Sequence, residues 1–247
     1  MNELRDIFKK YAAVVFFDTE TTGLDADTCQ IIELAAIRIE QSDKGLLRVA
    51  DTADLFVRLP EGQRLPEKIT ELTGITDATL EAEGVTEGEA AATFARIIND
   101  SKGRVLLVAH NAQFDILFVE AMATRSTVLS VGLLHRADYL DSLTVYKDRR
   151  AYPHKLANAI VAYKLEGKVQ NSHRAIDDVA ALFEVCRAMD DERADLLEYV
   201  NIFGYNPKYG VAGRRLAGVT YWPQRFNKFM QSPDYTLPAL AKKGAKA

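Results

Sequence analysis

The sequence predicts an α/β fold, a β-sheet with helices packed against it. Short apolar runs typical of buried strands come first in the chain, and further runs then alternate with segments of helical periodicity. The 247 residues include 48% hydrophobic and 27% charged side chains. A chain of this length and composition can bury a sizeable core.

Three strands are expected near the N-terminus. Ala13–Phe17 is a short apolar run, typical of a buried central strand. A second apolar run covers Ile31–Ile39, turn residues occupy Ser42–Gly45, and a third strand is expected within Leu46–Leu59. We expect the second and third strands to be antiparallel neighbours of the first.

Helices and strands alternate in the following segment. Apolar residues have helical spacing over Thr86–Asn99, Phe114–Met122, Leu156–Leu165 and Ala175–Leu197, the last with an interruption near Asp190. Further strands are expected at Arg104–Ala109 and around Ala137–Leu143.

After Val200 the sequence shows little clear periodicity, and turn dipeptides such as Asn-Pro and Trp-Pro recur. We therefore expect a domain over residues 1–200 and a C-terminal extension over residues 201–247 that packs on it. The extension has a net charge of +7 and the rest of the chain −11, which suits an anionic ligand approached from one side. Its aromatic side chains fit docking on the domain, which we favour, or stacking on the bases of a single strand.

The cysteines and the N-terminus narrow the class of protein. Cys29 and Cys186 lie among apolar neighbours, which favours reduced thiols over a disulfide framework or a zinc site. The apolar run at the N-terminus is cut short by Asp18, so it predicts neither a secretory signal nor a membrane span. We expect a cytoplasmic protein with no membrane association.

Two acidic residues end the first predicted strand. Asp18 and Glu20 are two positions apart, and side chains alternate across a strand, so both carboxylates can project from one face. Such a pair repels itself unless a cation lies between its members. A simple turn is the alternative interpretation, because Thr-Thr-Gly follows.

Two more acids lie on apolar helix faces. Asp115 shares a face with Phe118 and Val119, and Asn111 in the preceding loop already offers the N-terminal cap. Asp178 lies within the stripe of Ala175, Val179, Leu182, Phe183 and Cys186, whereas Asp177 falls on the solvated side. A buried ionised carboxylate is costly unless a cation or hydrogen-bond donors meet it. Hard divalent metals bound through oxygen would explain all four acids together.

Three segments then resemble known motifs. FFDTETTGL (Phe16–Leu24), VAHNAQFDILFVEA (Val108–Ala121) and SHRAIDDVAALFEV (Ser172–Val185) are similar to the three exonuclease motifs of the DEDDh, or DnaQ-like, 3′–5′ exonuclease family. This family includes the proofreading epsilon subunit of bacterial DNA polymerase III. LTGITDATL (Leu72–Leu80) resembles the segment between the first two motifs. The likeness spans roughly residues 13–190, with the motifs in the family's order.

The resemblance implies a ribonuclease H-like fold, a mixed five-stranded sheet whose second strand is antiparallel to the rest. It also implies that two Mg²⁺ or Mn²⁺ ions are held by the four carboxylates and act on the attacking and leaving oxygens at phosphorus. His173 falls on the family's general base and would accept a proton near neutral pH. The implied catalytic residues are Asp18, Glu20, Asp115, His173 and Asp178, all but His173 being metal ligands.

The resemblance also implies that the turn after the first strand contacts the terminal nucleotide of the substrate. Leu24 would act as an apolar wedge beside the base, and Gly23 would allow a positive φ angle and a close backbone approach. The implied substrate contacts are Thr21, Gly23, Leu24, Asn111 and Phe114, although Phe114 fits the core equally well.

The expected function is removal of 5′-mononucleotides from the 3′ end of a nucleic acid, single-stranded DNA being favoured, in proofreading or repair. A DNA polymerase is a possible partner. The alternatives are an RNA 3′-trimming enzyme, since no short motif encodes contacts to the 2′-hydroxyl, and a non-catalytic nucleic-acid-binding module.

Overall fold

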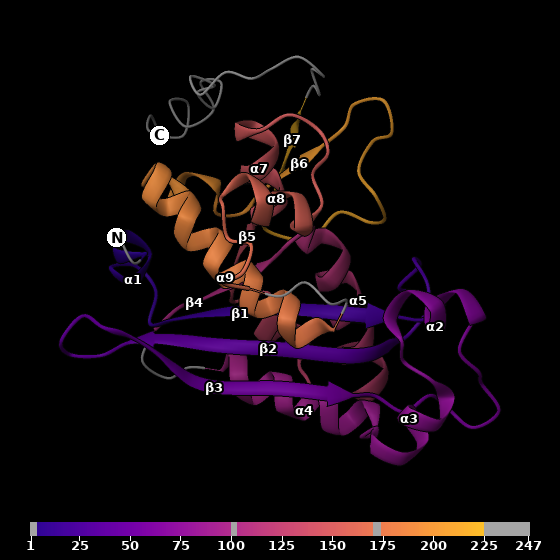
Figure 1. Cartoon of the computed structure of the whole chain (residues 1–247). Helices are drawn as coiled ribbons and strands as arrows, with labels where there is room; N and C mark the ends of the chain where they lie inside the picture. The colour runs from indigo at the N-terminus through magenta and orange to yellow at the C-terminus, as the bar shows by residue number, and fades with distance from the viewer. Residues whose placement is uncertain (1–3, 100–102, 170–173, 225–247) are drawn as a thin grey trace.

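The computed structural model describes residues 4–99, 103–169 and 174–224. Its centre is a five-stranded sheet in the order β3-β2-β1-β4-β5 (Figure 1). The strands are β1 (Ala13–Thr21), β2 (Ile31–Gln41), β3 (Leu47–Phe56), β4 (Val105–Ala109) and β5 (Asp138–Asp141). β2 is antiparallel to both β1 and β3, while β4 is parallel to β1 and to β5. This is the expected mixed sheet, with its second strand running against the others. The expectation that the third strand also neighbours the first was wrong, because β3 pairs with β2 at the edge of the sheet.

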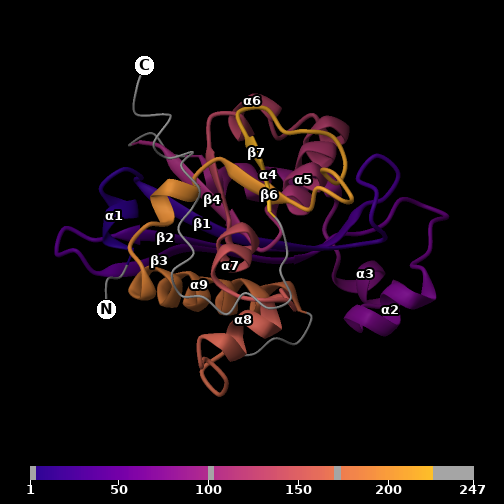
Figure 2. The same cartoon turned by 90° about the horizontal axis from the view of Figure 1, so that it is seen from above.

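Helices cover both faces of the sheet. They are α1 (Arg5–Phe8), α2 (Glu67–Thr73), α3 (Asp77–Glu83), α4 (Glu87–Ile98), α5 (Ala112–Ser126), α6 (Val131–Leu134), α7 (Ser142–Arg149), α8 (Leu156–Ala162) and α9 (Ala175–Glu192). α9 packs against β1 and β2 on one face with α8 beside it, and α4 and α5 pack on the other face (Figures 1 and 2). The sheet is therefore the middle of three layers.

Alternation along β1 divides the core between these layers. Val15 and Phe17 lie in the apolar cluster with α4 and α5, whereas Val14 and Phe16 lie in the cluster with α8 and α9. Because the strand continues to Thr21 instead of ending at Phe17, this alternation governs the orientation of the acidic residues that follow. The expected strand was four residues too short because threonine and ionised side chains do not extend an apolar run.

Other boundaries differ from the expected ones by a few residues. α5 begins at Ala112 and continues to Ser126, a turn beyond the expected Met122. α9 ends at Glu192, two residues after the expected interruption, and a 3₁₀ turn, η1 (Leu196–Tyr199), follows it. Leu72–Leu80 spans the end of α2 and the start of α3, with Gly74 between them at φ 73°.

Residues 201–224 contain two strands that sequence periodicity did not indicate, β6 (Ile202–Tyr205) and β7 (Thr220–Pro223), which pair in parallel. Phe203 is 2% exposed and Leu216 4% exposed, both within the core that α4 and α5 share. The backbone N–H of Tyr139 on β5 donates to Asn201 Oδ1 at 2.8 Å. This part of the extension is built into the domain's packing, and a domain division at residue 200 stays a prediction.

Both cysteines are free thiols, Cys186 buried and Cys29 partly buried. Among the helices that the structure describes, none is long and apolar enough to cross a membrane.

Candidate active site

Asp18 and Glu20 face the helix α9. They continue the alternation of Val14 and Phe16, whose side chains pack against that helix. Each offers a carboxylate oxygen that lies within 4.8 Å of the other and of one from Asp178. Three carboxylates from β1 and α9 thus gather at one place between the sheet and the helix.

The register of α9 presents Asp178 to this place. Asp178 is 9% exposed and lies among the buried residues Ala175, Val179 and Leu182. Asp177, one position earlier, is more exposed. The apolar stripe therefore distinguished the buried aspartate from its neighbour correctly.

Asp18 and Glu20 lie in an environment that strongly disfavours negative charge. Burial raises the pKa of Asp18 well above its usual value, and the charges of Asp115, Asp178 and Glu20 raise it further. Burial, followed by the charge of Asp178, raises the pKa of Glu20 to about 8. A set of clustered oxygen donors that repel one another fits a hard divalent cation, which would remove the repulsion. The site can therefore hold a metal.

Asp115 lies on α5, on the opposite face of the sheet from α9. It is 2% exposed, and its Oδ1 accepts from the backbone N–H of Thr19 at 3.1 Å and from Thr19 Oγ1 at 2.8 Å. Burial raises its pKa to about 7, while the two bonds from Thr19 act in the opposite direction. The charge of Asp115 contributes to the raised pKa of Asp18. Among the described residues, however, the group of carboxylates within 4.8 Å of one another does not include Asp115. The four acids are neighbours, and three of them form the tight group.

The start of α5 is fixed by a residue that the sequence did not single out. Asn111 occupies the N-cap position with φ 75°, but its side chain makes no capping hydrogen bond. Asp141, at the end of β5, accepts instead from the backbone N–H groups of Asn111 at 2.9 Å and Ala112 at 3.1 Å. The expectation that Asn111 caps the helix through its side chain was wrong, because a buried carboxylate from the neighbouring strand takes both amides.

Glu33 fixes the start of α9 in a similar way. It pairs with Glu20 across β1 and β2 and is fully buried. Its carboxylate accepts from Arg174 Nε at 2.8 Å and from the backbone N–H of Ala175 at 3.2 Å. The signal for this contact in the sequence was an acidic residue inside the apolar run Ile31–Ile39, because a buried carboxylate needs a cation or hydrogen-bond donors.

The turn after β1 differs from expectation at Gly23. Its φ lies outside the left-handed region, so the expected positive φ was wrong. The glycine is required by close packing, since a Cβ there would lie 2.7 Å from Cys29 Sγ. Thr21 is buried and its Oγ1 donates to the carbonyl of Gly23 at 2.6 Å. Leu24, in contrast, is 90% exposed.

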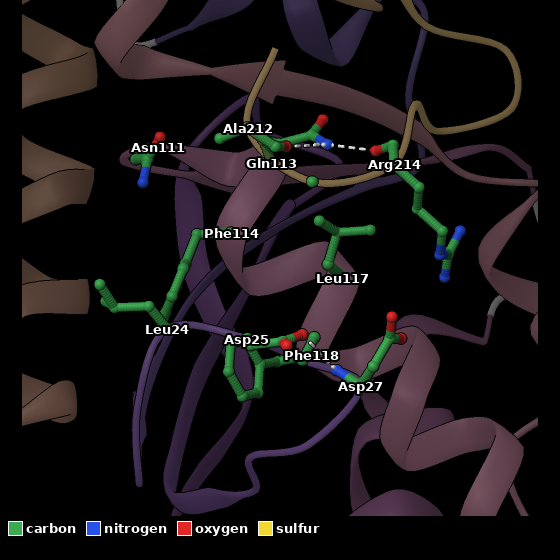
Figure 3. A pocket seen from close by; sticks show the side chains of 12 residues that line it. Leu24, Asp25, Asp27, Asn111, Gln113, Phe114, Leu117, Phe118, Ala212 and Arg214 are labelled. Atoms are coloured by element: carbon green, nitrogen blue, oxygen red, sulfur yellow. Dashed lines mark hydrogen bonds between the residues drawn. The ribbon is translucent and has the colours of Figure 1, made fainter. Parts of the chain in front are cut away.

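Three of the expected substrate contacts meet at one pocket. Leu24, Asn111 and Phe114 line a cavity of about 140 Å³ beside the start of α5 (Figure 3). Phe114 is only partly buried, and its ring lies 4.8 Å from that of Phe118, between centroids. His173, the expected general base, lies outside the described residues.

Comparisons with known proteins identify the family of this chain. The family model described as "Exonuclease" (RNase_T) matches residues 15–186. Ribonuclease T of Vibrio parahaemolyticus is 30% identical over 189 residues, which cover 74% of this chain and 86% of that protein. The PolC-type DNA polymerase III of Clostridium perfringens is 29% identical over 197 residues, 79% of this chain but 12% of the polymerase.

A solved structure supports the fold. Exonuclease I of E. coli in complex with a dT13 oligonucleotide superimposes with a TM-score of 0.65 at 18% identity, covering 76% of this chain and 43% of that one. This chain therefore spans most of the ribonuclease but a small part of the polymerase and less than half of exonuclease I. With a family model matching well over half of its residues, the chain belongs to the RNase_T exonuclease family.

Proposed function

We propose that this protein is a metal-dependent 3′–5′ exonuclease that removes 5′-mononucleotides from the 3′ end of a single strand, preferentially DNA. The observation that carries the proposal is the group formed by Asp18, Glu20 and Asp178 within 4.8 Å, in a chain of an exonuclease family. Asp178 is buried and Asp18 and Glu20 are partly buried, and carboxylates gathered at one point repel one another unless a cation lies between them.

Asp18, Glu20, Asp115 and Asp178 would hold two Mg²⁺ or Mn²⁺ ions. Bound there, the cations supply Lewis-acid stabilisation of the attacking and leaving oxygens in an in-line displacement at phosphorus. Asp115 and Asp178 are buried and Asp18 and Glu20 are partly buried, which limits the screening of this interaction by bulk water.

The surrounding residues hold the acids in place. Thr19 orients Asp115 through two hydrogen bonds to one oxygen, and Glu33 anchors the first turn of α9, which carries Asp178. His173 is proposed, from its place in the third motif, to accept the proton of the attacking water. Such pre-organisation matters because a displacement of about 1 Å can cost about 100-fold in rate.

The choice of DNA rests on the relatives. Exonuclease I was solved with a DNA oligonucleotide and the PolC-type relative is a DNA polymerase. A second candidate is RNA 3′-trimming, favoured by the likeness to ribonuclease T, which extends over 86% of that protein. A polymerase subunit as partner is proposed only on the likeness to PolC.

Matched single strands of DNA and RNA, labelled at the 5′ end, test the proposal. With Mn²⁺ or Mg²⁺ we expect a ladder of products shortened from the 3′ end, faster for DNA, and no products in EDTA. Faster cleavage of RNA would select the second candidate. Cleavage that persists in EDTA, or no cleavage of either strand, would refute the metal-dependent exonuclease.

A further inference from the structure

The described part of the C-terminal extension, residues 201–224, is connected to α5, the helix that carries Asp115 in its first turn. It lies beyond residues 15–186, which the family model matches. Two sets of hydrogen bonds make the connection, one through a buried threonine of α7 and one through a glutamine side chain on α5 itself. The extension can therefore act on the placement of one of the four acids, although the exonuclease motifs do not include it.

Thr144 on α7 makes the first connection. It is 1% exposed, and its Oγ1 accepts from the backbone N–H of Gly204 on β6 at 2.7 Å and donates to Asp141 Oδ2 at 2.6 Å. The other carboxylate oxygen of Asp141 accepts from the backbone N–H groups of Asn111 and Ala112. A backbone N–H can only donate and a hydroxyl has one proton to give, so the hydroxyl of Thr144 points at the carboxylate. The group that caps α5 is thus held in turn by β6.

Gln224 fastens the same threonine from the end of β7. Its Nε2 donates to the backbone carbonyl of Thr144 at 2.9 Å and to Asp148 Oδ1 at 2.7 Å. Gly204 leaves the space for this side chain, since a Cβ at that position would overlap the amide oxygen of Gln224. Both strands of the extension therefore bond to Thr144, one at its hydroxyl and the other through Gln224 at its carbonyl.

Gln113 makes the second connection, two positions before Asp115. Its Oε1 accepts from the hydroxyl of Tyr221 on β7 at 2.6 Å. Its Nε2 donates to the carbonyl of Ala212 at 3.1 Å and to that of Arg214 at 2.6 Å (Figure 3). The extension thus makes three hydrogen bonds to one side chain in the first turn of α5.

The placement of Asp115 depends on how α5 lies on the sheet. Asp18 and Glu20 belong to β1, whereas Asp115 reaches the site from a helix on the opposite face from α9. Thr19 holds one of its oxygens, and the contacts at the start of α5 hold the backbone that carries it. A displacement of about 1 Å at a catalytic site can cost about 100-fold in rate. The contacts that fix α5 therefore bear on whether the four acids can share their cations.

We propose that residues 201–224 act as a brace on α5 that positions Asp115 for metal binding, with Thr144 and Tyr221 as its positioning residues. The proposal rests on the proposed exonuclease function, in which Asp115 is a metal ligand. When either connection is cut, the first turn of α5 is less well held and Asp115 is displaced relative to Asp18. The brace thus gives the extension a role in the active site in addition to its packing on the domain.

The Mn²⁺ affinity of the full chain tests the brace. It is measured from the signal of free Mn²⁺ in electron paramagnetic resonance, and separately as the Mn²⁺ concentration that gives half the maximal rate of nucleotide release. Thr144→Val keeps the shape of the side chain but cannot bridge Gly204 and Asp141, whereas Thr144→Ser keeps the hydroxyl. We expect Thr144→Val to weaken Mn²⁺ binding about tenfold, since loss of a residue that orients metal ligands typically costs about 10–100-fold. Thr144→Ser should restore the affinity to within about twofold of the wild type.

Thr86→Val is the matched control for the threonine. Thr86 Oγ1 also accepts from a backbone N–H, that of Glu89 at 3.2 Å, and donates to a carboxylate oxygen, Glu89 Oε2 at 2.8 Å. These bonds form the N-terminal capping box of α4, so their loss lowers Tm without releasing α5. The Mn²⁺ affinity of Thr86→Val should stay within about twofold of the wild type.

A pair of tyrosine variants tests the second connection. Tyr221→Phe keeps the ring in its packing and removes the hydroxyl bonded to Gln113, so it should likewise weaken Mn²⁺ binding about tenfold. Tyr163→Phe is the control. It removes a hydroxyl that donates to Glu192 Oε2 at 2.8 Å, at the ends of α8 and α9, and should leave Mn²⁺ affinity unchanged.

The outcomes separate the brace from the function. Mn²⁺ affinities of Thr144→Val and Tyr221→Phe within about twofold of the wild type, or equal losses in the two controls, overturn the brace while nucleotide release by the wild type upholds the exonuclease. A loss in only one of the two confines the positioning to that connection. Should Thr144→Val fail to fold by circular dichroism, Tyr221→Phe decides alone. A wild type that neither binds Mn²⁺ nor releases nucleotides refutes the proposed function and the brace with it.

Discussion

Replacing Glu33 by glutamine removes a buried negative charge next to the carboxylates and hardly changes the size of the side chain. Glu33 is fully buried and receives hydrogen bonds from Arg174 Nε and from the backbone of Ala175, at the start of α9. The amide of glutamine accepts through one oxygen only, so one of these bonds is lost. The first turn of α9, which carries Asp178, then loses part of its attachment to β2.

The magnitude follows from these contacts. A hydrogen bond to a charged group contributes about 1.5–3 kcal/mol. The side chain of Arg174 is 40% exposed and lies 3.9 Å from Asp54, so water and that carboxylate recover part of the loss. We expect the free energy of unfolding to fall by about 2 kcal/mol, which corresponds to about 4–8 °C in Tm for a chain of this size. Without metal the loss should be smaller, because Glu33 also adds to the repulsion on Asp18 and Glu20.

The assay is the release of the first nucleotide at a temperature where every variant is folded, with Tm measured in parallel. For Glu33→Gln we expect kcat to fall about tenfold, or about 1.4 kcal/mol of barrier. Glu40→Gln is the control, since Glu40 lies on the same strand and pairs with Arg38 and Arg48 away from the site. A kcat for Glu33→Gln within twofold of that for Glu40→Gln would refute the anchoring role.

Three further predictions concern the site and its turn. Asp178→Asn should abolish nucleotide release while Asp177→Asn changes it little, since of the two only Asp178 is buried and lies in the group with Asp18 and Glu20; equal losses would show that the assigned helix face is wrong. Millimolar Mn²⁺ should raise the Tm of the wild type, because at 100 times Kd a bound ligand adds about 2.7 kcal/mol to the free energy of unfolding. It should not raise the Tm of Asp18→Asn, and equal Tm shifts in scanning fluorimetry would contradict metal binding here. Gly23→Ala should lower stability by about 1–3 kcal/mol through its clash with the sulfur of Cys29, and adding Cys29→Ala should restore it; a double variant no more stable than the single would remove that explanation.

Local periodicity accounts for what the sequence predicted well. Alternation along β1 orients Asp18 and Glu20 to one side, and helical spacing selects Asp178 over Asp177. Both patterns depend on residues within a few positions of each other. The antiparallel second strand followed from the family resemblance, but local patterns placed the third strand beside the first, whereas β3 pairs with β2.

Long-range contacts could not be predicted in this way. Thr19 and Asp115 are 96 positions apart, and Glu33 and Arg174 are 141 apart, so no local pattern links them. β6 and β7 are four residues each and gain stability only by pairing with one another and packing on the domain. Gln113 on α5 likewise donates hydrogen bonds to the carbonyls of Ala212 and Arg214, 99 and 101 positions later.

The most direct test of the account compares the wild type with Asp18→Ala on a single-stranded DNA labelled at its 5′ end, in Mn²⁺. The wild type should release mononucleotides stepwise from the 3′ end. Asp18→Ala should show no detectable release, with an unchanged circular dichroism spectrum, because Asp18 lies at the centre of the acidic group. A folded Asp18→Ala variant whose rate stays within about tenfold of the wild type, a loss of no more than about 1.4 kcal/mol of barrier, would contradict it.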